Sequence, residues 1–364
     1  MTPVASKNRI IFIDLIRAFA VLNMVQGHTI DVLLAAEYRS FDNWLYALWH
    51  TNRGLTAPIF LFTAGTVFTY LFRLQKVPFA QNPRVMRGLK RSLLLLFVAY
   101  ILRYPTPTIV YWGFVTQQQL DIFFTVDVLH LISIGLASIV LLAWISEKLG
   151  GRDKTVFLTF TIMIIVAYYF TEKVNWLEYM HRGLAGYLSR SAGSFFPIFP
   201  FLAYLTAGAF LGSFLADKPN VFRQKKFTVY LAGIGSGLII LALLIDIVEQ
   251  QLTGTSTLWT TSPALVVLRL GIVLIFNAVF TYISARLESI PRILILLGRN
   301  TLLIYVVHLM ILYGSTWNPG ITLLFKQAFG PVLTIGCAFV MIGLMMLLVW
   351  LINKFNIKNK ALVT

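Results

Sequence analysis

The chain has 364 residues, of which 58% are hydrophobic and only 12% are charged, and its mean hydropathy is +0.79. Soluble domains carry about 25% charged residues, so this composition excludes a soluble protein. The single cysteine, Cys337, also excludes an intrachain disulfide framework. We therefore expect one integral membrane domain over residues 1–364.

The net charge of +16 is explained better by membrane orientation than by binding to nucleic acid. Cytoplasmic loops of membrane proteins collect Lys and Arg, and we expect no nucleic-acid partner. The N-terminal segment, Met1 to Lys7, precedes a long apolar run without a small-residue cleavage pattern. We expect this run to be a retained first helix and not a signal peptide.

Ten segments are apolar enough to cross the hydrocarbon core, which takes about 20 helical residues. In chain order they are 10–34, 55–73, 91–104, 128–146, 155–171, 195–215, 227–247, 263–285, 293–313 and 331–353. The third should stop at the proline pair Pro105 and Pro107. The aromatic stretch 109–124 leaves the count at ten or eleven. We predict an all-α, polytopic transmembrane helix bundle.

The basic residues support this span arrangement. With the N-terminus in the cytoplasm, 21 of the 30 Lys and Arg residues fall in the inner segments and seven in the outer ones. The outer seven are Arg39, Arg53, Arg103, Lys173, Arg182, Arg190 and Lys326. This bias follows the positive-inside rule and predicts that both termini are cytoplasmic.

The first predicted helix carries four charged or titratable side chains, Asp14, Arg17, His28 and Asp31. Such groups inside a span are costly and usually functional. The eleven-residue spacing of Arg17 and His28 places them within about 20° of one face and about 16 Å apart along the helix. The alternative is a structural Asp14–Arg17 ion pair with His28 as an interfacial residue.

All five histidines fall on the predicted outer side of the membrane. They are His28, His50, His130, His181 and His308, and Asp31, Asp127, Asp246 and Arg269 reach the same level. Titratable groups that converge there would suit proton transfer from an acceptor hydroxyl or amine. For His130 and His308 the alternative is a hydrogen-bonded core histidine.

A basic cluster lies at the predicted cytoplasmic mouth of the third span. Arg84, Arg87 and Arg91 have the spacing of one helical face. Arginine matches phosphate geometry, so the cluster could hold a nucleotide-like ligand. The alternative is a set of orientation charges on anionic lipid headgroups.

Three glycines indicate close helix packing, and several common catalytic and binding motifs are missing from the sequence. Gly65, Gly208 and Gly212 lie in patterns suited to close helix packing. The sequence has no P-loop, zinc-ligand spacing or Gly-x-Ser-x-Gly turn, and we expect no metal.

The stretch 13–28, IDLIRAFAVLNMVQGH, resembles the first helix of polytopic acyltransferases, with Asp-x-x-Arg followed by a His. These include the acyltransferase-three family and the heparan-alpha-glucosaminide N-acetyltransferase catalytic domain. The stretches 57–65, 196–212 and 297–308 are similar to the second group. Relatives often have Gly after the motif Arg, where this chain has Ala18.

The resemblance implies transfer of an acyl group, commonly acetyl from acetyl-CoA, onto a sugar or glycan. It implies that His28 is the catalytic base or a transient acyl carrier, and that Arg17, Arg84 and Arg87 bind the acyl donor. We expect Asp14 and Arg91 to join this donor-binding set.

The leading hypothesis is an acyl-CoA-dependent integral membrane acyltransferase with a carbohydrate or other polar acceptor on the outer side of a bacterial cytoplasmic membrane. In its catalytic set, Asp31 or Asp127 orients His28. Asn300 or a backbone donor stabilises the oxyanion, and His308 adds a second imidazole. Membrane lipid is a further expected partner, and a homodimer is compatible with the sequence.

The rival hypothesis is a polytopic transporter for a small polar or anionic solute. Its substrate or proton path would contain Asp14, Arg17, His28, Asp246 and Arg269. The sequence lacks paired Gly/Pro-broken helices in matching halves, which argues against this class.

Overall fold

The computed structural model describes residues 10–108, 111–218, 220–287 and 289–362. Within these ranges the chain is helical and has no strand, only two isolated β-bridges. The longer helices are α1 (Ile11–Leu33), α2 (Trp44–Arg53), α3 (Thr56–Arg73), α4 (Pro83–Leu102), α6 (Val128–Lys148), α7 (Asp153–Thr171), α9 (Ile198–Asp217), α10 (Lys225–Thr253), α11 (Pro263–Arg286), α12 (Arg292–Arg299), α13 (Thr301–Leu312) and α15 (Pro331–Leu362). Short helices are α5 (Gln117–Phe123), α8 (Arg182–Leu188), α14 (Thr322–Phe325) and the 3₁₀ turns Ala36–Tyr38, Phe79–Gln81, Trp176–Glu178 and Val221–Arg223. The all-α prediction is confirmed.

The predicted spans correspond to helices. Among the described residues, eight helical stretches are long and apolar enough to cross a membrane, or nine if the bent pair α12 and α13 forms one span. The remaining predicted span is α4, a 20-residue helix whose first half is basic. The stretch 109–124 contains only the seven-residue α5 in its described part. A helix of that length is far too short to cross the membrane.

The third span begins earlier than its apolar residues indicate. It was expected over 91–104, but α4 starts at Pro83 and contains Arg84, Arg87 and Arg91. Proline at the first helical position suits a helix start, and the Asn82 side chain caps it by accepting from the Arg84 backbone N–H at 2.9 Å. The three arginines therefore lie on one helix, as their spacing predicts.

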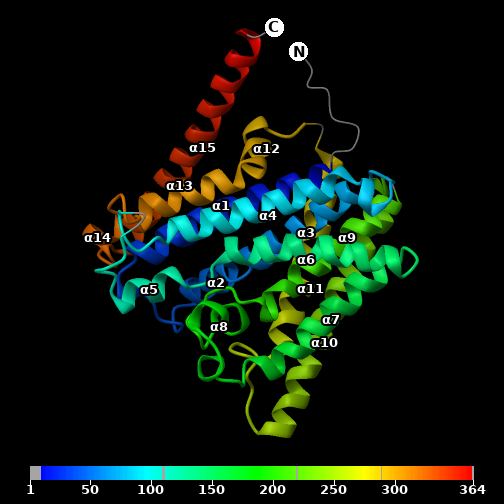
Figure 1. The fold of residues 1–364 in the computed structure, drawn as a ribbon, viewed down its shortest axis with the longest axis horizontal. Coiled ribbons are helices and arrows are strands. Elements are labelled where there is room, and N and C mark those ends of the chain that lie inside the picture. Colours follow the sequence, from blue (N-terminus) through cyan, green and yellow to red (C-terminus); the bar gives the residue numbers. More distant parts are fainter. Residues whose placement is uncertain (1–9, 109–110, 219, 288, 363–364) are drawn as a thin grey trace. The chain divides into compact units, whose positions relative to one another are not determined.

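The chain forms two compact units. Unit 1 contains Met1–Thr56 and Val279–Thr364, and unit 2 contains Ala57–Ala278. In unit 1, α1 packs against α12, α13 and α15, so the first helix is held by the last part of the chain (Figure 1). The pair α12 and α13 is bent by 77°.

The core of unit 2 includes a very close contact between α3 and α9. A Cβ atom built on Gly208 would lie 1.9 Å from the Phe62 carbonyl oxygen, and one on Gly65 would lie 1.9 Å from the Leu205 carbonyl oxygen. A Cβ on Gly212 would lie 2.4 Å from the Thr66 carbonyl oxygen. Only residues without a Cβ permit this approach, which confirms the packing role predicted for the three glycines.

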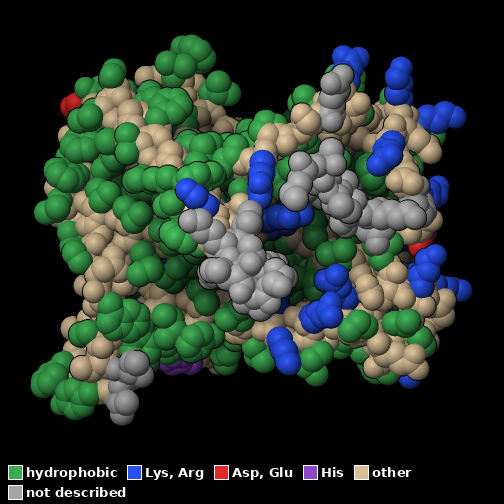
Figure 2. Space-filling model, turned by 90° about the horizontal axis from the view of Figure 1, so that it is seen from above, with side chains coloured by type: hydrophobic (Ala, Val, Ile, Leu, Met, Phe, Trp, Pro, Cys, Tyr) green, Lys and Arg blue, Asp and Glu red, His purple; other side chains and the backbone are tan. Residues whose placement is uncertain are grey.

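Two ion pairs in unit 2 each join segments that are predicted to lie on the same side of the membrane. The predicted inner ends of α3 and α7 are joined by Arg73 Nε and Asp153 Oδ2 at 2.6 Å. The predicted outer segments are joined by Arg182 Nη1 and Asp121 Oδ1 at 2.8 Å. Figure 2 shows a face of the molecule on which Lys and Arg side chains are frequent and Asp and Glu side chains are rare. Which side of the membrane each end faces stays a prediction.

Candidate functional site

Two histidines and a tyrosine meet in unit 1. His28, in the last turns of α1, is partly exposed, and its Nδ1 lies 3.1 Å from the Tyr313 hydroxyl. Its ring centroid lies 5.4 Å from that of His308 on α13. Tyr313 follows α13 directly, so this helix supplies both neighbours of the His28 imidazole. The structure thus brings together the predicted residues His28 and His308.

The tautomer of neutral His308 is fixed by the backbone. Its side chain is fully buried, and its Nδ1 lies 2.6 Å from the Ile304 carbonyl oxygen. A carbonyl only accepts, so Nδ1 carries the proton and Nε2 carries a lone pair. Nε2 is buried and has no hydrogen-bond partner among the described residues. His308 therefore presents an unsatisfied acceptor within the group formed with His28 and Tyr313.

Asp31 forms ion pairs with arginines. Among the described residues, no hydrogen bond joins it to the His28 ring. Its Oδ2 accepts from Arg53 Nη2 at 2.9 Å, and its Oδ1 lies 3.6 Å from Arg39 Nη1. The Arg53 stem passes Gly27, because a Cβ built there would lie 3.4 Å from Arg53 Cγ. Asp31 thus holds the guanidinium of Arg53 close to the turn that carries His28.

A network of amides between α1 and α2 was not anticipated from the sequence. Asn23 Nδ2 donates to Thr56 Oγ1 at 2.7 Å, while its Oδ1 accepts from Asn52 and Gln26, each at 2.7 Å. Gln26 Oε1 in turn accepts from Trp49 Nε1 at 2.9 Å. The network fixes α2, and with it Arg53, against α1. The sequence signal that could have revealed this network is the presence of uncharged amide side chains inside an apolar span.

The other end of α1 meets the break between α12 and α13. Arg17 Nη2 donates to Thr301 Oγ1 at 3.2 Å. A Cβ on Gly298 would lie 2.6 Å from the Asp14 carbonyl oxygen, so the helices touch there. Asn300 caps the break and donates from Nδ2 to the Leu296 carbonyl at 2.8 Å. At about 1.5 Å of helical rise per residue, Asn300 lies about 12 Å from His308 along the axis of α13. Asn300 is therefore at the level of Arg17 and not at the level of His28.

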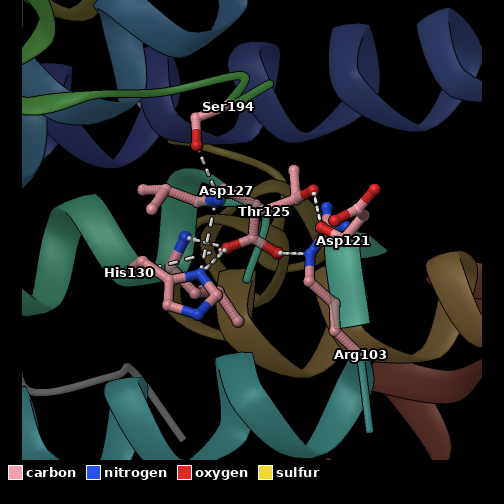
Figure 3. Close-up of polar contacts among 8 residues, drawn as sticks. Arg103, Asp121, Thr125, Asp127, His130 and Ser194 are labelled. Carbon is pink, nitrogen blue, oxygen red and sulfur yellow. Dashed lines mark hydrogen bonds and ion pairs between the residues drawn. The ribbon is translucent and has the colours of Figure 1, made fainter. Parts of the chain in front are cut away.

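Asp127 belongs to unit 2 and has its own partners (Figure 3). As N-cap of α6, its Oδ1 accepts from the backbone N–H groups of Leu129 at 2.9 Å and His130 at 3.4 Å. The same oxygen lies 3.0 Å from His130 Nδ1, and Oδ2 accepts from Arg103 Nε at 3.1 Å. These contacts define a helix cap and a charge pair.

The charge state of Asp127 follows from these contacts. Burial alone would raise its pKa, but the hydrogen bond with His130 and the Arg103 charge outweigh that effect. The pKa of Asp127 is therefore held below its usual range. The carboxylate stays ionised at neutral pH and keeps the loop before α6 attached to Arg103.

The basic cluster on α4 has one unsatisfied donor. Arg84 is partly buried, whereas Arg87 and Arg91 are exposed. The Nε of Arg84 is buried and has no hydrogen-bond partner among the described residues. A buried donor next to two exposed guanidinium groups fits a phosphate-bearing ligand. The described part of the chain holds no group of three or more His, Cys, Asp or Glu side chains placed to bind a metal.

This fold and this group of residues define a multi-pass membrane protein with titratable side chains gathered in its first helix. Residues 9–245 match the family described as heparan-alpha-glucosaminide N-acetyltransferase, catalytic, and the chain belongs to this family of membrane acetyltransferases. The matched range contains Arg17, His28 and Asp127 and ends before Asn300 and His308. A comparison with curated proteins gives no match.

Proposed function

We propose that the chain transfers an acyl group, in the simplest case acetyl, from acyl-CoA to a hydroxyl or amine of a carbohydrate or similar polar acceptor. The acceptor would lie on the outer side of a bacterial cytoplasmic membrane. The observation that carries the proposal is the group of His28, His308 and Tyr313 in unit 1 of an acetyltransferase-family chain. A partly exposed imidazole beside a hydroxyl and a second imidazole is suited to proton transfer.

In the proposed reaction His28 is the general base. With its Nδ1–H donated to the Tyr313 oxygen, its Nε2 takes the proton of the acceptor as the acceptor oxygen or nitrogen attacks the acyl carbonyl. The thioester C–S bond breaks, and the proton passes from His28 to the departing thiolate. The products are acylated acceptor and CoA–SH, so atoms and charge balance.

The neighbours of His28 have separate proposed roles. Tyr313 orients the imidazole, and the unsatisfied Nε2 of His308 accepts a hydrogen bond from the acceptor or from a water molecule beside it. Asp31 acts through Arg53, whose positive charge it holds near the site. In this proposal no carboxylate contacts the imidazole of His28 directly.

Acyl-CoA, when bound, supplies the thioester whose acyl group is transferred. Arg84, Arg87 and Arg91 are proposed to bind its phosphates, because Arg84 offers a buried and unsatisfied N–H donor. Asp14, Arg17 and Asn300 are proposed to lie along the donor route toward His28. The α1 stripe from Arg17 to His28 covers about 16 Å, which is about half the hydrocarbon thickness.

The test uses the purified full chain with radiolabelled acetyl-CoA and glucosamine as the probe acceptor. The wild type should release CoA and label the sugar, and His28→Ala should lose at least about a hundredfold in rate, since a general base contributes 10²–10⁴-fold. Tyr313→Phe removes one hydrogen bond and should lose about tenfold. A variant His28→Ala that keeps more than about a tenth of the rate would contradict the proposed base.

His181 provides the matched control. It is also a histidine of a predicted outer segment, but its Nδ1 only caps α8 by accepting from the Gly183 N–H at 3.1 Å. His181→Ala should keep the wild-type rate. If the wild type neither releases CoA nor becomes labelled, the acyltransferase proposal fails and the transporter hypothesis gains support.

A further inference from the structure

Arg53, the last residue of α2, places a positive charge on the turn of α1 that carries His28. Its Nη2 lies 2.9 Å from Asp31 Oδ2, and a Cβ built on Gly27 would lie 3.4 Å from its Cγ and 3.8 Å from its Cδ. Gly27 precedes His28 directly, and Asp31 follows it by three residues. Because residues three apart on a helix have Cβ atoms about 5–6 Å apart, the guanidinium lies within about one helical turn of the proposed base.

This positive charge is only partly neutralised. Asp31 also pairs with Arg39, whose Nη1 lies 3.6 Å from Asp31 Oδ1, so two guanidinium groups share one carboxylate. The Nε and Nη2 of Arg39 donate to backbone carbonyls at the end of α1, whereas the side chain of Arg53 stays 33% exposed. The Cζ of Arg53 lies 5.7 Å from the ring centroid of Trp49, one turn back on α2. Arg53 can therefore meet a further anionic oxygen from its exposed side.

The amides between α1 and α2 hold Arg53 at this position. Asn52, the neighbour of Arg53 in the sequence, donates from Nδ2 to Asn23 Oδ1 at 2.7 Å, and its carbonyl accepts from Asn23 Nδ2 at 3.2 Å. The same Asn23 oxygen accepts from Gln26, and the same nitrogen donates to Thr56, each at 2.7 Å. Asn23 is only 5% exposed, and its amide uses two donor and two acceptor positions. A buried amide that is fully satisfied specifies a single arrangement of the two helices.

An acyl transfer at His28 requires a group that stabilises the oxyanion. When the acceptor attacks the acyl carbonyl, the carbonyl π electrons move onto its oxygen, and a preorganised donor beside that oxygen lowers the barrier. Asn300 is the residue that the sequence favours for this role, but it lies about 12 Å from His308 along the axis of α13. Arg53 instead brings a charged donor to the turn of His28 itself.

We propose that Arg53 stabilises the oxyanion of the acyl transfer and that Asn23 positions it through α2. The inference rests on the proposed function, in which His28 takes the acceptor proton. The guanidinium donates to the carbonyl oxygen while this oxygen carries the negative charge. The electron pair then re-forms the C=O bond as the C–S bond breaks, and the proton passes from His28 to the thiolate. Because the charge exists only near the transition state, loss of Arg53 lowers kcat and leaves KM nearly unchanged.

The test measures kcat and KM for acetyl-CoA and glucosamine with the purified full chain. Arg53→Gln keeps a donor for Asp31 but should lower kcat about a hundredfold, since removal of one oxyanion donor costs about 10²–10³-fold, with KM for acetyl-CoA within about twofold of the wild type. Arg53→Lys restores the charge without the planar fork and should recover at least about tenfold of that loss. An Arg53→Gln variant that keeps more than about a tenth of the wild-type kcat, or that changes KM alone, overturns the catalytic role.

A double-variant cycle tests the positioning role. Asn23→Ala should lower kcat at least about tenfold, and the double variant Asn23→Ala with Arg53→Gln should be no slower than Arg53→Gln alone, because Asn23 acts through Arg53. Losses that multiply would overturn this role. The matched control is Asn277→Ala, since Asn277 is a buried amide of α11 whose Nδ2 donates to the Val273 carbonyl at 2.7 Å. It should lower the thermal midpoint and leave kcat unchanged.

The outcomes also separate this inference from the proposed function. A wild type that transfers no acetyl group contradicts both. An active wild type in which His28→Ala is inactive and Arg53→Gln is as fast as the wild type contradicts the role of Arg53 alone.

Discussion

The contact between α3 and α9 gives a sharp prediction for Gly208→Ala. The new Cβ would lie 1.9 Å from the Phe62 carbonyl oxygen and 2.7 Å from its carbonyl carbon, whereas real Cβ contacts stay above 3.0 Å. The helices must therefore separate locally by about 1 Å. Overpacking of this kind costs about 1–3 kcal/mol, and the upper end applies because the opposing atom is backbone and no rotamer change can move it.

The free energy of unfolding should fall by about 2 kcal/mol, after about 0.5–1 kcal/mol is regained from replacing a helical glycine by alanine. The assay is thermal unfolding of the purified chain in detergent. Gly233→Ala on α10 is the matched control, because nothing lies within 4 Å of its Cβ position. It should become slightly more stable. Equal stability of Gly208→Ala and Gly233→Ala would refute the inferred closeness of the two helices.

Three further predictions follow from the site and the span arrangement. Replacing Arg84 and Arg87 together with Ala should raise KM for acetyl-CoA more than it lowers kcat, because they would supply uniform binding; an unchanged KM would contradict donor binding. Asp127→Asn should be less stable than the wild type at neutral pH. Since the folded-state pKa of Asp127 is lowered, this difference should shrink as pH falls below about 4, and a pH-independent difference in thermal midpoints would contradict the charge pair. In a cysteine-free background, an impermeant reagent added outside should label a cysteine at Asn318 and spare one at Asn220; the reverse would place the basic loops outside.

Much of the fold could be predicted because apolar length is a direct requirement of the bilayer. The first ten residues of α4 were harder to assign, since four of them are Arg or Lys and such residues are typical of loops. The 77° bend between α12 and α13 was also missed. Beside this bend Gly298 lies against the Asp14 carbonyl, a contact between opposite ends of the sequence that no local pattern reveals.

The candidate site was predictable only in part. His28 and His308 stand out as imidazoles in apolar spans, but Tyr313 lies 285 residues from His28, and tyrosines near span ends are common. Asp127 was proposed as an orienting carboxylate, yet an Asp directly before an apolar helix, with His130 at the third helical position, is the pattern of a capping box. Local capping chemistry was therefore the stronger signal at that position.

The two ends of the chain depend on each other for the proposed base. The family match covers residues 9–245 and so includes α1 with His28, while His308 lies on α13 and Tyr313 directly after it, both beyond the matched range. Unit 1 is assembled from both parts, and the α1–α13 contact fixes which groups surround the His28 imidazole. Because the protonation of a general base depends on its hydrogen-bond partners, α13 would control the reactivity of His28. A chain that kept α1 but lost α13 would retain the matched range 9–245 without the hydroxyl and the second imidazole beside its base.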